Sequence, residues 1–158
     1  MRLTTMTDYA MRLLMYVAQR PERLCTIAEV AQAYGISEAH LMKVTHRLSL
    51  QGWLKTIRGK GGGMCLAAAP KDINLGSVVR SIEPDFYLVD CLTGDTNCNL
   101  MGHCKLTGIM SGALQSLMQY LYGYTLADLL APSEEGGADA LPAPSSGDRR
   151  RHIRLARG

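Results

Sequence analysis

Three cysteines lie close together in a polar, glycine-bearing segment, at Cys91, Cys98 and Cys104. Six residues separate the first two and five separate the last two, so three thiolates can converge on one soft metal centre. Zinc ribbons and fingers place their ligands in closer pairs, and a redox pair needs a Cys-x-x-Cys motif, which this segment lacks. Iron–sulfur clusters accept looser spacings but normally have four ligands, so a fourth must come from elsewhere. The alternative is a set of unconnected thiols.

The rest of the chain has the composition of a globular cytoplasmic protein. It has 158 residues, of which 47% are hydrophobic, enough for one compact domain with extensions. No apolar run approaches the about 18 residues of a membrane span, and residues 1–8 lack the apolar core of a signal peptide. An odd number of cysteines, five, argues against a secreted disulfide framework. We therefore expect a cytoplasmic location, reduced thiols and no membrane partner.

Charge is distributed unevenly along the chain. Residues 1–82 contain 11 Lys and Arg against 5 Asp and Glu, whereas residues 83–130 contain 1 against 5. Residues 131–158 are nearly balanced, with 5 against 4. A basic first part and an acidic cysteine-containing part suggest two roles, the first of them contact with a polyanion. A solvated basic face would give the same balance.

Hydrophobic spacing predicts three helices in the first third of the chain. The first covers residues 7–19, with Thr7 as its N-cap. The second, residues 26–34, opens with a Thr-x-x-Glu capping box and is stopped by Gly35. The third, residues 37–51, has a serine cap. Helix, glycine turn and helix is the helix-turn-helix pattern, in which the third helix enters the major groove of DNA.

A β-hairpin is predicted next, with strands 53–57 and 64–66 around a glycine-rich turn. Arg58 and Lys60 in that turn supply charge for a phosphate or the minor groove, which indicates the wing of a winged helix. No Gly-Lys-Ser/Thr follows, so the turn is not the phosphate loop of an NTPase. The predicted fold class is mainly α with a small β-hairpin wing (α+β), a winged helix-turn-helix. The predicted DNA-contacting residues are Ser37, His40, Lys43, Thr45, Arg47, Arg58 and Lys60.

The second half of the chain is expected to contain two further helices. A short one, capped by Asn74, ends before Pro84. A longer one, residues 105–122, is apolar over much of its surface, which favours packing on its copy in a homodimer. The predicted organisation is a winged-helix DNA-binding domain (1–83), a cluster-binding loop (84–105), a dimerisation helix with a last turn (106–130) and a disordered tail (131–158).

Five motifs follow one another along the chain: Thr7-Asp8-Tyr9-Ala10, Tyr34-Gly35-Ile36-Ser37, the turn of residues 58–63, the three cysteines and residues 124–129. In this order they resemble the Rrf-two (Rrf2) family of winged-helix iron–sulfur repressors over residues 1–130. The resemblance implies a transcriptional repressor rather than an enzyme. It also implies an iron–sulfur cluster, with 4Fe–4S favoured over 2Fe–2S, and a homodimer on an inverted-repeat operator.

The same resemblance bears on the fourth ligand and on the signal. In nitric-oxide-sensitive members that hold a 4Fe–4S cluster, an Asp in the first helix of the other subunit completes the ligand set, and Asp8 matches that position. A relative that responds to iron–sulfur status uses a histidine three residues past the last cysteine, where this chain has Thr107. The resemblance therefore implies release of operator DNA when nitric oxide nitrosylates the cluster. Asp8 as a simple helix-supporting acid and His103 as a competing iron ligand stay open.

Other interpretations also stay open. One is an iron- or iron–sulfur-status-responsive regulator of the same family. Another is a zinc-site DNA-binding protein that uses the three cysteines and His103, although adjacent His103 and Cys104 make poor tetrahedral geometry. A third is an electron carrier or redox enzyme with a cluster, but the winged helix and the lack of a catalytic constellation count against it. Cys25 and Cys65 match no ligand position and are interpreted as structural or incidental.

Overall fold

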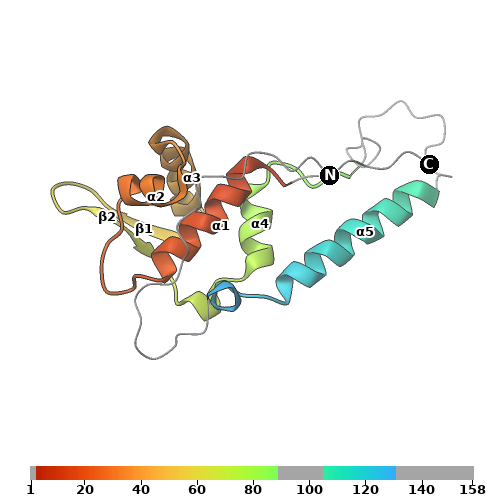
Figure 1. Ribbon diagram of the computed structural model, residues 1–158. Helices are drawn as coiled ribbons and strands as arrows, with labels where there is room; N and C mark the ends of the chain where they lie inside the picture. Colours follow the sequence, from red (N-terminus) through yellow and green to blue (C-terminus); the bar gives the residue numbers. More distant parts are fainter. Residues whose placement is uncertain (1–2, 89–104, 131–158) are drawn as a thin grey trace, which may run out of the picture.

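The computed structural model describes residues 3–88 and 105–130 (Figure 1). It confirms the predicted fold class, a mainly helical protein with one two-stranded antiparallel hairpin in the described part. None of the helices described is long and apolar enough to cross a membrane. The predicted tail, residues 131–158, lies outside the described residues. The elements in chain order are α1 (Thr5–Ala18), α2 (Ile27–Tyr34), α3 (Glu38–Leu50), β1 (Leu54–Ile57), β2 (Gly63–Leu66), the 3-10 turn η1 (Pro70–Asp72), α4 (Leu75–Ile82), α5 (Lys105–Tyr122) and the 3-10 turn η3 (Leu126–Leu129).

The first helix, α1, begins earlier than the sequence predicts. Its N-cap is Thr4, whereas Thr7 lies inside the helix and is buried. The Thr4 side chain caps no amide of the helix. Instead, the backbone N–H and the hydroxyl of Thr4 donate to Oε1 of Glu83, at 2.8 and 3.2 Å. The helix start is therefore held by a residue 79 positions away, and Asp8 falls within the first turn.

The helix-turn-helix forms where the local capping signals predict it. Thr26 and Glu29 make a reciprocal capping box at the start of α2, with the Thr26 N–H donating to Glu29 Oε2 at 2.7 Å. Gly35 ends α2 with a φ of +63°, a conformation that favours glycine. Ser37 then caps α3 by accepting the His40 N–H at 3.4 Å. These local signals set the turn between the two helices.

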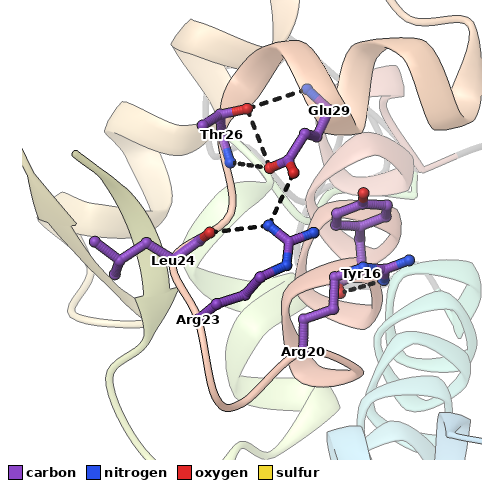
Figure 2. A network of polar contacts seen from close by, with 6 residues as sticks. All are labelled: Tyr16, Arg20, Arg23, Leu24, Thr26 and Glu29. Carbon is purple, nitrogen blue, oxygen red and sulfur yellow. Dashed lines mark hydrogen bonds and ion pairs between the residues drawn. The ribbon is translucent and has the colours of Figure 1, made fainter. Parts of the chain in front are cut away.

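An arginine extends the capping box of α2 (Figure 2). The Arg23 guanidinium lies 2.8 Å from Glu29 Oε1 and donates to the Leu24 carbonyl at 3.1 Å. The hydrogen bond from the Thr26 backbone N–H, together with the Arg23 contact, lowers the pKa of Glu29 below its usual value. A lowered pKa means that the ionised carboxylate is favoured by folding.

We expect Glu29→Gln to lower the free energy of unfolding at pH 7 by roughly 0.5–1 kcal/mol, because the amide keeps the capping acceptor but removes the negative charge that lies beside Arg23 and the start of α2. Because folding lowers the pKa of Glu29, its charge contributes stability above the unfolded pKa of about 4.3 and loses it as pH falls through the folded value. The difference between the wild type and the variant should therefore shrink below about pH 4. Urea unfolding across this pH range measures it, and a difference that grows on acidification would contradict the assignment.

The wing is the antiparallel pair β1 and β2. A Cβ at Gly62 would clash with the carbonyl oxygen of Ile57, and two other glycines of the turn have positive φ. The tight turn therefore requires glycine, as the sequence indicates. Arg58 and Lys60 are both exposed in it.

The hydrophobic core lies between α1, α2, α3, the wing and α4. The last turn, η3, packs into this core through Leu126, which is fully buried.

Unlike these elements, α5 projects from α4 toward the end of the molecule opposite the wing (Figure 1). Met118 is the one described residue of α5 that is buried, while Leu106 and Ile109 are 52% and 67% exposed. An apolar helix with so little cover is what a dimerisation helix requires. The predicted domain boundaries and the packing of α5 on its copy stay predictions.

Candidate functional site

The winged helix leaves most of the predicted DNA-contacting side chains exposed. Such exposure is the first requirement for contact with a duplex, and α3 and the wing turn supply basic groups together. The exposed members of the predicted set are Ser37, His40, Lys43 and Arg47 on α3 and Arg58 and Lys60 in the wing turn.

Thr45 is the exception, and its prediction as a DNA contact is corrected by its burial. Its side chain is 6% exposed, and its Oγ1 lies 3.7 Å from the sulfur of Met64 on β2. It therefore packs in the interior, between α3 and the wing. Thr45 lies four residues after Leu41 and three before Leu48, so the helical period places it on the buried face of α3 although its side chain is polar.

His40, although exposed, contacts two other side chains of the same chain. Its Nδ1 lies 2.8 Å from Ser37 Oγ, and its ring packs on Tyr9 of α1 with the ring centroids 6.2 Å apart. Because Tyr9 follows Asp8 directly, this contact joins the start of α1 to the first turn of α3.

One face of α3 contains three exposed residues that the sequence prediction missed, beside the predicted Lys43. Buried residues define the opposite face of the helix, and the spacing i, i+3, i+4, i+7 places four exposed residues on one stripe. Counting the helical period from the buried positions would have found the three additional residues, Ala39, Met42 and His46. We call this face the outer stripe; it consists of Ala39, Met42, Lys43 and His46.

If Lys60 contacts phosphate, as predicted, Lys60→Ala should weaken binding to every DNA sequence to a similar degree. The slope of log K against log salt should fall in magnitude by about one. Titrations of one duplex at several salt concentrations measure this slope. Lys71→Ala, which removes an exposed lysine from η1, is the matched control and should leave the slope unchanged. An unchanged slope for Lys60→Ala would contradict wing contact.

Asp8, the predicted fourth cluster ligand, is exposed in the first turn of α1. Its side chain is 52% exposed and forms an ion pair with Arg12, one turn later, at 3.1 Å. An exposed ion pair of this kind is weak, so the carboxylate is available to another partner. Whether it ligates a cluster stays a prediction.

The predicted thiolate ligands, Cys91, Cys98 and Cys104, lie outside the described residues. Within residues 3–88 and 105–130, no three His, Cys, Asp or Glu side chains come together as a metal site. The predicted ligand set therefore stays a prediction. Asp8 is the member whose surroundings are known.

Cys25 has the surroundings of a structural residue. It is fully buried, its backbone pairs with Met64 of β2, and burial raises the pKa of its thiol. A thiol that stays protonated is a poor metal ligand and a poor nucleophile. Cys65, on β2, is half-buried.

Comparison with known proteins decides the family. The Rrf2 family, described as iron-dependent transcriptional regulators, matches residues 3–132. This chain belongs to the Rrf2 family. The HTH-type transcriptional regulator NsrR of Halalkalibacterium halodurans is 44% identical to it over 137 residues, covering 85% of this chain and 94% of that protein. NsrR of Bacillus subtilis is 43% identical with the same coverage.

A solved structure shows the same fold for another regulator. CymR, the global cysteine regulator of B. subtilis, superposes with a TM-score of 0.65 at 23% sequence identity. The match covers 82% of this chain and 95% of CymR. As an Rrf2 family member, the protein is a DNA-binding transcriptional regulator and not an enzyme, as the sequence predicts.

Proposed function

We propose that this Rrf2 protein is a cytoplasmic repressor that senses nitric oxide. It binds an inverted-repeat operator as an iron–sulfur-loaded homodimer and releases the DNA when nitric oxide reacts with the cluster. The observation that favours this function most is Asp8, an exposed carboxylate in the first turn of α1 at the position of the fourth ligand in nitric-oxide-sensitive members. The identity to relatives named NsrR supports the same choice.

In this proposal Cys91, Cys98 and Cys104 hold a 4Fe–4S cluster together with Asp8 of the partner subunit. A carboxylate oxygen is a hard donor for a soft site, so Asp8 would be the most weakly bound of the four ligands. When bound, the cluster would supply iron to which nitric oxide can bind. Loss of the Asp8 contact would free α1 of one subunit from the cysteine segment of the other.

Contacts between α1 and α3 could transmit a displacement of α1 to the proposed DNA-contacting helix. Tyr9 packs on His40 in the first turn of α3, and His40 is hydrogen-bonded to Ser37, the cap of α3. The first turns of a recognition helix are those that enter the major groove. A displaced start of α1 therefore displaces the part of α3 that contacts bases.

The start of α1 is also joined to Glu83, the residue before the predicted cluster-binding loop (84–105) of its own chain. Glu83 follows α4, is 9% exposed, and accepts both hydrogen bonds from Thr4. In a dimer the two winged helices must match half-sites about one helical turn apart. A small shift at this junction therefore weakens binding at both half-sites, which is the coupling that a switch requires.

Anaerobic purification, with counts of iron, sulfide and zinc per chain, tests the cofactor. We expect a brown protein with near-equal iron and sulfide, and zinc in their place would favour the zinc-site alternative.

A duplex selected from a random pool by the loaded protein then provides the probe for function. Nitric oxide should release it from the loaded protein. Release on iron depletion but not on nitric oxide addition would favour an iron-status regulator.

A further inference from the structure

The first half of the outer stripe of α3 is apolar. Ala39 and Met42 are both exposed, Met42 with 55% of its surface accessible. Leu50, the last residue of α3, is the other large apolar side chain exposed on this helix. A single exposed methionine is ordinary on a protein surface, so its surroundings decide its role.

The surroundings of Met42 favour DNA over a protein partner. Lys43 and His46 share its stripe, and the wing turn adds two further cations. Glu38, the one acidic residue of α3, is compatible with a groove because a carboxylate accepts from the amino group of cytosine. Two small apolar contacts are also well below the few hundred Å² of an apolar patch that marks a protein interface.

The major groove offers one apolar group to such a side chain, the 5-methyl group of thymine. Polar base edges placed against a methionine would lose water without gaining a hydrogen bond. The methionine side chain is unbranched and polarizable, so it can adjust to the position of the methyl group.

We propose that Met42, flanked by Ala39, contacts a thymine 5-methyl group in each half-site and so determines part of the sequence preference. This inference rests on the proposed function, because it requires α3 to lie in the major groove. It adds a specificity-determining residue whose role does not depend on the nature of the signal.

Substituting deoxyuridine for thymine tests the proposal, since the two bases differ only by the 5-methyl group. The cluster-loaded wild type first selects duplexes from a random pool. Each thymine of the selected site is then replaced singly, and dissociation constants are measured by fluorescence anisotropy. At one thymine in each half-site we expect binding of the wild type to weaken about fourfold, the effect of one buried methyl group.

Met42→Ala should lose this distinction and bind the thymine and deoxyuridine duplexes within about twofold of each other. Because Met42 is exposed and alanine favours helices, the variant should keep the melting temperature of the wild type. Leu50→Ala is the matched control, since it removes an exposed apolar side chain, 69% accessible, from the far end of α3. It should keep the fourfold effect.

Equal losses for the wild type and Met42→Ala at every thymine would overturn the inference while leaving the proposed function intact. So would a selected site in which no thymine shows a methyl effect. If the loaded protein selects no duplex, the proposed function itself fails, and the inference fails with it.

Discussion

Changing Cys98 to alanine is expected to abolish both the colour of the protein and its high-affinity operator binding. The same result is expected for Cys91→Ala and Cys104→Ala. Two thiolates and one weak carboxylate are too few ligands for a stable cluster. In the proposed homodimer, loss of the cluster should remove the arrangement of the two winged helices that matches both half-sites. Affinity should then fall about a thousandfold or more, toward the non-specific level.

The remaining cysteines are the matched controls for this experiment. Cys25→Ala should keep full iron loading and lower the free energy of unfolding by roughly 1–2 kcal/mol, because a buried side chain is truncated. Cys65→Ala should keep both the colour of the protein and its high-affinity operator binding. Iron, sulfide and visible spectra are measured on the five anaerobic preparations. Full iron loading in Cys98→Ala would remove Cys98 from the ligand set.

Changing Asp8 to alanine has the second-largest expected effect, and it acts on the response rather than on assembly. A cluster should still form, since three thiolates remain, but with an altered spectrum. The dependence of DNA binding on the state of the cluster should weaken, because α1 is no longer joined to the partner's cysteine segment. Asp8→Cys should instead give a more inert, all-thiolate site.

Arg12→Gln separates this role from simple support of the helix. It removes the ion pair of Asp8 while keeping the carboxylate. An exposed i,i+4 pair contributes only about 0.3–0.5 kcal/mol, so both variants should differ little from the wild type in stability. The variant Arg12→Gln should keep the spectrum and nitric-oxide response of the wild type. If it instead matched Asp8→Ala in both, the ion pair and not a ligand bond would explain the effect.

The features predicted correctly from sequence are those set by neighbours along the chain. The capping box at Thr26, the stop at Gly35 and the cap at Ser37 each depend on residues within one helical turn. The start of α1 was predicted wrongly because its stabilising acceptor, Glu83, lies 79 residues away from Thr4. No local pattern contains that information.

In the candidate DNA interface, the sequence prediction was also incomplete for single side chains. Thr45 was predicted as a DNA contact, although the helical period places it inward. Met42 was not predicted, although the same period places it outward. His40 contacts Tyr9 of another helix, which only the packing of α1 against α3 brings about. The convergence of the three cysteines with Asp8 stays a prediction, since it requires the cysteine segment and a second subunit.

A nitric-oxide titration of operator binding, with the wild type and Asp8→Ala side by side, tests the central claim most directly. Both proteins are loaded with cluster, and the fraction of bound duplex is followed together with the visible spectrum. The account predicts that the wild type releases its DNA as nitric oxide is added, and that Asp8→Ala differs in spectrum and shows a weaker link between cluster state and release. Identical spectra and identical release curves would contradict it. Asp8 would then be only a helix-supporting acid, and the fourth ligand would be sought at His103 or in solvent.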